Sequence, residues 1–250
     1  MADPETTPTG GPRTPRLVLL HGMGGTGAVW HRWRPLLDRY WPERWLAPDL
    51  AGHGTAAPLP GYSFTALADR VADLLDPAEP VVVLGHSLGG VVGLTLAARP
   101  GGPPVDRVVG LGIKTVWTSD DLARAGALAR RPVTWFASRD EAADRYLKVA
   151  GLAGLLDPAD PAVDPGLVEQ DGRWRLAMDP AAFGVGAPDL TGLLGAVRCP
   201  VTLARGEHDP MVTDAHLAGY GVPVVTLPGL GHSAHVEDPS TVFRELLPPG

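Results

Sequence analysis

The sequence predicts an α/β protein in which helices flank a mostly parallel sheet of about six strands, with one helical insertion. Short apolar runs typical of buried strands alternate with helical patterns, which favours parallel pairing, right-handed crossovers and helices on both faces. The alternation stops once, and short helical patterns take its place. The expected strands cover residues 17–20, 45–47, 81–84, 105–111, 201–204 and 222–227.

The chain divides into three parts by its pattern. Residues 1–15 are rich in Pro and Thr and lack an apolar core segment, so we expect a flexible tail that is neither a signal peptide nor a membrane span. Residues 16–113 and 197–250 carry the alternating pattern of the sheet domain, and residues 114–196 form the insertion. A chain of 250 residues with 44% hydrophobic content can bury one sizeable core, which favours a single sheet domain.

Composition excludes several classes of function. The net charge of −7 and the absence of a basic stripe argue against a nucleic-acid partner. The single cysteine, Cys199, allows no internal disulfide and gives no support for secretion, so we expect a cytoplasmic protein with a small-molecule substrate and no membrane partner. No cluster has the ligand spacing of a metal site, and we expect no metal or organic cofactor.

Ser87 is the candidate nucleophile. It lies at the centre of the segment GHSLGG (residues 85–90), directly after an apolar strand and directly before an apolar helical pattern. Such a G-x-S-x-G turn between strand and helix is so sharp that the serine adopts a strained backbone conformation, and only glycines two residues away leave room for it. The pattern therefore predicts a serine hydroxyl that projects from the edge of the sheet.

A serine hydroxyl needs a base to take its proton, and His232, in a loop after the last strand, is the candidate. Among the other histidines, His235 is expected to begin the last helix, and His21 to shape a loop. A carboxylate must then hold the base in one tautomer, and Asp209 after the strand 201–204 fits the chain order Ser, Asp, His. Four other carboxylates remain alternatives for this role: Glu207, Asp214, Asp120 and Asp121.

Attack on a carbonyl produces an oxyanion, which backbone N–H groups must stabilise. One donor is expected at Leu88, directly after the nucleophile, and the other at Met23 in the glycine-rich loop after the first strand. This loop lacks the lysine and Ser/Thr of a phosphate-binding P-loop, so the oxyanion interpretation is favoured.

Five segments in chain order, HGMGG, PDLAGHG, GHSLGG, RGEHDPM and GLGHSAHVEDP, resemble the α/β-hydrolase-fold serine hydrolases. They correspond to that family's oxyanion loop, the turn after its next strand, the nucleophile elbow, the acid loop and the histidine loop. The resemblance implies a catalytic triad of Ser87, Asp209 and His232, and it implies no particular substrate. Because few residues precede the first strand, we expect a sheet shortened at its N-terminal side.

In this family an insertion forms a cap over the active site, and residues 114–196 are expected to do the same, with helices at 119–130 and 139–149. Lys114, directly after a sheet strand, could pair a substrate anion or form a salt bridge at the base of the cap. The aromatic side chains of the insertion could line a pocket or form the cap's own core. The candidate substrate-binding residues are Gly22, Met23, His86, Lys114, Trp117, Trp135 and Phe136.

The combined pattern predicts a serine hydrolase that cleaves an ester, lactone or thioester of a small, largely apolar substrate through an acyl-enzyme on Ser87. Two other classes remain open. One is a lyase or cyclisation catalyst in which His232 transfers a proton and Ser87 is never acylated. The other is a small-molecule binding protein derived from a hydrolase.

Overall fold

The computed structural model describes residues 15–42 and 44–247, and its centre is a sheet of six parallel strands. The spatial order is β2-β1-β3-β4-β7-β8, with every neighbouring pair parallel. The predicted fold class and strand number are thus confirmed. The strands are β1 (Arg16–Leu20), β2 (Trp45–Leu46), β3 (Val81–His86), β4 (Val105–Leu111), β7 (Val201–Gly206) and β8 (Val224–Leu227).

The central strands are apolar on both faces because helices cover both sides of the sheet. In β1, Leu17 and Leu19 belong to one apolar cluster, whereas Val18 and Leu20 belong to a second cluster on the opposite face. Every residue of β3 is buried. Such continuous Val- and Leu-rich strands are typical of parallel sheets with both faces covered.

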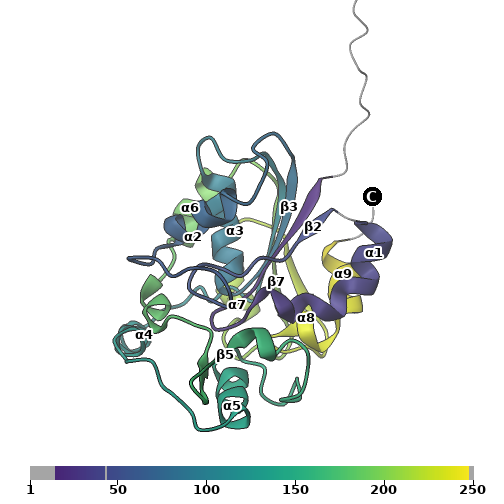
Figure 1. Cartoon of the computed structure of the whole chain (residues 1–250). Coiled ribbons are helices and arrows are strands. Elements are labelled where there is room, and N and C mark those ends of the chain that lie inside the picture. Colours follow the sequence, from purple (N-terminus) through teal and green to yellow (C-terminus); the bar gives the residue numbers. More distant parts are fainter. Residues whose placement is uncertain (1–14, 43, 248–250) are drawn as a thin grey trace, which may run out of the picture.

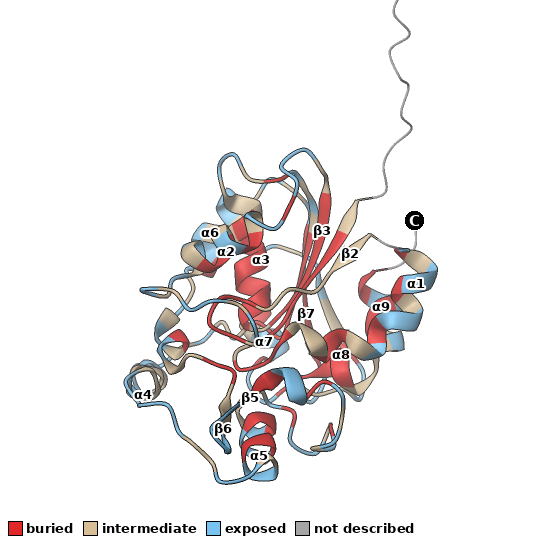
Figure 2. Cartoon of the chain, in the orientation of Figure 1, coloured by how far each residue is buried: buried red, intermediate tan, exposed pale blue. Residues whose placement is uncertain are grey.

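Helices form a layer on each face, as Figure 1 shows. On one side lie α2 (Phe64–Ala72), α3 (Leu88–Ala98) and α6 (Leu190–Ala196). The other side carries η1 (Gly27–Trp33), α1 (Arg34–Tyr40), α8 (Ala234–Glu237) and α9 (Pro239–Leu246). Helix α3 is buried along most of its length (Figure 2), because it packs against the sheet and against both α2 and α6.

The insertion between β4 and β7 lies at one end of the sheet (Figure 1). The two predicted helices are present as α4 (Ser119–Ala129) and α5 (Arg139–Val149). The sequence analysis did not predict the antiparallel hairpin of β5 (Leu167–Gln170) and β6 (Arg173–Leu176). Its two-residue turn, Asp171-Gly172, has positive φ at both positions and is a known hairpin signal.

Two of the predicted parts, the N-terminal tail and the insertion, have boundaries that the structure describes only in part or divides differently. Residues 1–14 of the expected tail lie outside the described residues. Helix α6 falls within the predicted insertion 114–196 but packs against α3 of the sheet domain, with Leu190 buried between them. The division into a sheet domain and a cap stays a prediction. None of the helices in the described ranges has the length and apolarity needed to cross a membrane.

Candidate active site

Ser87 occupies the turn between β3 and α3 with a strained backbone, at φ 51° and ψ −114°. Positive φ is uncommon for a residue with a side chain and persists only where the surroundings enforce it. The surroundings here are two close backbone approaches. A Cβ at Gly85 would overlap the backbone of Gly89, and a Cβ at Gly89 would overlap the carbonyl groups of Leu20 and His21. The glycines two residues on either side of Ser87 therefore permit the turn.

Asp209 and His232 form a hydrogen-bonded pair at the ends of β7 and β8. His232 Nδ1 lies 2.8 Å from Asp209 Oδ2, and the Asp209 side chain is fully buried. The second carboxylate oxygen, Oδ1, accepts a hydrogen bond from the Met211 N–H at 2.8 Å. Because the carboxylate accepts the Nδ1 proton, the neutral ring presents Nε2 as an unprotonated acceptor, which is the tautomer that a general base requires.

Ser87 and His232 line one pocket of about 390 Å³. Among the hydrogen bonds of the described residues, none joins the Ser87 hydroxyl to His232. Catalytic hydrogen bonds are often long in structures without a ligand and tighten when substrate binds. The arrangement therefore brings the candidate nucleophile and the candidate base to one pocket.

The alternative carboxylates have other partners. Glu207 accepts a hydrogen bond from the Gly229 N–H, and Asp214 pairs with Arg205 at 2.7 Å. Asp121 pairs with Lys114, and Asp120 lies on the exposed first turn of α4. Of the five candidates, Asp209 is the one that bonds to His232.

The two predicted oxyanion donors face the same pocket. Met23 and Leu88 both line it beside Ser87. Within residues 15–42 and 44–247, the backbone N–H of neither residue donates to another protein group. Leu88 is the first residue of α3, where an N–H has no partner inside the helix. These two donors are thus available to an oxygen atom bound next to Ser87.

Two buried histidines support the loops around the site. His21 Nδ1–H donates to the Gly22 carbonyl at 2.8 Å, and its Nε2 accepts from the Leu50 N–H at 2.9 Å. His86 donates through Nε2 to the His232 carbonyl at 3.0 Å. Burial, followed by the charge of His53, lowers the pKa of His21 to about 3. Burial also holds the pKa of His86 well below 6.5, so both rings are neutral at pH 7.

His235 completes this cluster on the side away from the pocket. It is buried in α8, its ring lies 4.2 Å from that of His86 and 4.6 Å from that of Trp30, and its pKa is lowered to about 3, chiefly by burial. His235 Nδ1 and Trp30 Nε1 are buried without a hydrogen-bond partner among the described residues. The sequence analysis expected His235 to be a polar residue at the start of a helix and did not predict that its side chain is buried.

Some of the predicted substrate-binding residues line the pocket that holds Ser87, and others do not. Gly22, Met23, His86, Lys114 and Trp117 line it. Trp135 and Phe136, also predicted to bind substrate, do not line it. The segment that contains Trp135 and Phe136 lies beside the β5–β6 hairpin, where Phe136 forms an antiparallel bridge with Trp174. Phe136 lines a neighbouring pocket instead, and Trp135 lines a third.

Lys114 has a partner within the protein. Its Nζ lies 2.9 Å from Asp121 Oδ2 and 4.7 Å from the centre of the Trp117 ring. Hydrogen bonds from Lys114 and from Thr118 lower the pKa of Asp121 to about 2. Of the two roles considered for Lys114, the geometry favours the salt bridge at the base of the cap.

The sequence analysis overlooked two residues that lie beside the candidate triad of Ser87, Asp209 and His232. Gly112, at φ 67°, lies so close to the triad that a Cβ there would be 3.1 Å from His232 Cε1 and 3.5 Å from Asp209 Oδ2. Arg205 is buried beneath the acid loop, where it pairs with Asp214 and donates to the carbonyls of Gly206, Glu207 and Val212. Two features of the sequence could have pointed to these residues. Gly112 follows β4 directly and stands two positions before Lys114, and Arg205 is a charged residue inside the apolar strand β7.

Comparison with known proteins places this geometry in context. The sequence model of the group described as "Alpha/beta hydrolase family" matches residues 17–246. The relative Lipase LipV of Mycobacterium tuberculosis is 34% identical over 184 residues, which span 67% of this chain and 65% of LipV, less than two thirds of its length. The Magnesium-chelatase 30 kDa subunit of Rhodobacter capsulatus is 31% identical over 255 aligned residues, covering 91% of this chain and 84% of that subunit.

Solved structures show the same architecture. The crystal structure of E-2-(Acetamidomethylene)succinate Hydrolase superposes with a TM-score of 0.75 and 25% sequence identity. The superposition covers 93% of this chain and 90% of the other.

Proposed function

The chain belongs to the alpha/beta hydrolase family, and on that premise we propose that it is a serine hydrolase cleaving an ester, lactone or thioester through an acyl-enzyme on Ser87. The observation that carries the proposal is the placement of a strained Ser87 in the same pocket as His232, whose Nδ1 is bonded to the buried Asp209. A lipase among the relatives supports hydrolysis as the reaction class.

In the proposed first step, Ser87 Oγ attacks the substrate carbonyl carbon while His232 Nε2 accepts the hydroxyl proton. Asp209 stabilises the imidazolium that forms. The carbonyl oxygen becomes an oxyanion between the N–H groups of Met23 and Leu88, a type of contact whose loss costs about 10²- to 10³-fold in rate. His232 then protonates the leaving alcohol or thiol as its bond to carbon breaks.

The second step reverses the roles of nucleophile and leaving group. A water molecule attacks the acyl-enzyme carbonyl and gives one proton to His232 Nε2. The bond between the carbonyl carbon and Ser87 Oγ breaks, His232 returns the proton to Ser87, and a carboxylic acid is released. Every proton is conserved over the cycle, and water is the co-substrate.

The pocket supports a small, largely apolar substrate. Its volume is about 390 Å³, and side chains from both the sheet domain and the insertion line it. Six of the apolar lining residues are Met23, Phe64, Val91, Trp117, Leu128 and Phe183. Because Trp117, Leu128 and Phe183 come from the insertion, we propose that this segment acts as the cap that shapes the acyl site.

The test is the intact mass of the protein after incubation with a neutral fluorophosphonate, compared with Ser87→Ala. We expect a single adduct that the variant lacks, and turnover of p-nitrophenyl esters that the variant loses. The matched control is Ser63→Ala, which removes a hydroxyl that caps α2 and is not among the residues that line the pocket. Absence of an adduct on folded protein contradicts the acyl-enzyme and leaves proton transfer by His232, or ligand capture, as the chemistry of the site.

A further inference from the structure

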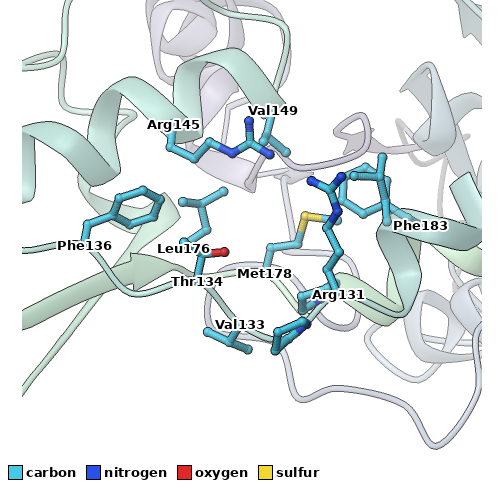
Figure 3. Close-up of a pocket in the computed structure, with 12 residues that line it drawn as sticks. Arg131, Val133, Thr134, Phe136, Arg145, Val149, Leu176, Met178 and Phe183 are labelled. Atoms are coloured by element: carbon cyan, nitrogen blue, oxygen red, sulfur yellow. The ribbon is translucent and has the colours of Figure 1, made fainter. Parts of the chain in front are cut away.

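A second, smaller pocket of about 90 Å³ lies in the insertion beside the pocket that holds Ser87. Its lining comes from the end of α4 and the segment after it, from α5, and from the end of β6 and the residues that follow, and it includes Thr134, Phe136, Leu176 and Met178 (Figure 3). Three apolar side chains, Leu128, Val149 and Phe183, line both pockets. The two spaces are therefore neighbours that share one apolar wall.

Two guanidinium groups enter this second pocket. Arg145 extends from α5 and Arg131 from the segment after α4, and Figure 3 shows both reaching toward the space near Met178. Neither side chain forms an ion pair or hydrogen bond within the described part of the chain. No carboxylate is present among the described residues of the lining.

This arrangement is unfavourable without an anion. Arginine stays protonated at every physiological pH, so two unpaired guanidinium groups directed into one space repel each other. Both residues are exposed, so water is the present partner of their guanidinium groups. A carboxylate or phosphate between them would remove the repulsion and accept charge-assisted hydrogen bonds from the planar donors of both residues.

We propose that this pocket binds the anionic end group, a carboxylate or a phosphate, of a substrate whose apolar chain crosses the shared wall and whose carbonyl lies at Ser87. The proposal rests on the serine hydrolase function proposed above and names its substrate class. The apolar wall of Leu128, Val149 and Phe183 would contact the chain, while Arg131 and Arg145 would bind its end. Substrates with a charged end would then be selected over neutral ones of equal length.

Arg124 offers a competing position for the anion. It lies on α4, one helical turn before Leu128, whereas Arg131 follows the end of that helix, and it lines the Ser87 pocket itself. It forms no ion pair with any described residue. An anion held there would sit closer to Ser87 and would not use the second pocket.

The experiment compares charged and neutral substrates of matched shape. One arm uses p-nitrophenyl monoesters of adipic, suberic and sebacic acid against the same esters ending in a primary amide. The other arm uses octanoyl-phosphopantetheine against octanoyl-pantetheine, which places the anion on the leaving group. The measured quantity is the ratio of kcat/KM for the charged and neutral members, in wild type, Arg131→Gln, Arg145→Gln and the double variant.

We expect wild type to prefer the charged member at least about tenfold in one arm, a difference equal to roughly 1.4 kcal/mol. Each single variant should reduce this preference and the double variant should abolish it, with most of the loss falling on the charged member. Arg130→Gln and Lys148→Gln remove one charge from a neighbouring position outside the pocket and should keep the preference. The arm in which the preference appears shows whether the pocket takes a carboxylate on the acyl chain or a phosphate on the leaving group.

Three results would overturn the proposal: no preference in either arm, a preference that survives in the double variant, or a preference that Arg124→Gln alone abolishes. A binding measurement that needs no turnover tests this proposal independently of the proposed hydrolase activity. Suberic acid monoamide and inorganic phosphate are titrated calorimetrically into Ser87→Ala, with and without the two arginine substitutions. Loss of binding on substitution supports the pocket even if Ser87 proves unreactive, and equal binding overturns it even if ester hydrolysis is confirmed.

Discussion

His86 Nε2 donates a hydrogen bond to the backbone carbonyl oxygen of His232, with 3.0 Å between nitrogen and oxygen. The two rings lie 4.7 Å apart by their centroids. The residue directly before the proposed nucleophile thus holds the loop of the proposed base, although 146 positions separate them in the chain.

Replacing His86 with Phe should lower kcat by about tenfold and leave KM nearly unchanged. The substitution removes the donor and leaves the His232 carbonyl unpaired, a change that typically costs about 1–3 kcal/mol. Steady-state kinetics with a neutral ester test this, and His86→Gln, which keeps an N–H donor, should recover part of the loss. Equal effects on kcat and KM, or no rescue by Gln, would show that the contact does not position the base.

Replacing Gly112 with Ala should reduce kcat/KM by about 10- to 100-fold, because the new methyl group would lie 3.1 Å from His232 Cε1 and displace the ring. Gly221→Ala is the matched control. Gly221 has nearly the same φ, 69° against 67°, and no atom within 4 Å of the added Cβ. Both variants carry the same backbone strain and should lose similar stability, but only Gly112→Ala should lose activity. Full activity in both variants would refute the steric argument.

The stability of the protein should fall as pH is lowered from 6.5 toward 3. The pKa of His235 is about 3 in the folded chain, mainly through burial, and 6.5 in the unfolded chain. Between these values the unfolded chain binds the extra proton, so the contribution is fully present above pH 6.5 and is lost as pH decreases. From pH 6.5 to 5 this amounts to about 2 kcal/mol for one histidine.

Urea unfolding of wild type and His235→Phe at pH 7 and pH 5 measures this contribution. The variant should lose less stability on acidification, because one buried titrating group has been removed. His21 and His86, whose pKa values are also lowered by burial, should maintain part of the pH dependence in the variant. Identical slopes for the two proteins would contradict a neutral, buried His235.

Replacing Lys114 with Met should change kcat/KM equally for an acidic and a neutral ester. The ammonium is paired with Asp121 at 2.9 Å, and a partly exposed ion pair near the surface contributes about 0–1 kcal/mol, so we expect changes below roughly fivefold. The same pair of substrates used for the arginine pocket serves here. A loss confined to the acidic ester would assign the substrate anion to Lys114 instead.

Much of the fold follows from local sequence patterns. The run of valines before Gly85 predicts β3, the apolar pattern after Ser87 predicts α3, and the observed elements extend these predictions by a few residues at most. Helices α4 and α5 were predicted nearly residue for residue, and each begins at a Thr or Ser that caps it, Thr118 and Ser138. The β5–β6 hairpin was not predicted, and its two strands have only four residues each.

The sequence alone determined the elbow at Ser87, the order of the five matching segments and the six-stranded parallel sheet. Backbone sterics and hydrophobic periodicity act between residues that are close in the chain, so they can be read without coordinates. Tertiary structure decided that Asp209 bonds His232, that Trp135 and Phe136 lie away from the Ser87 pocket, and that Arg131 and Arg145 enter one space. Such contacts depend on how separate elements dock and where their loops end, which no local pattern specifies.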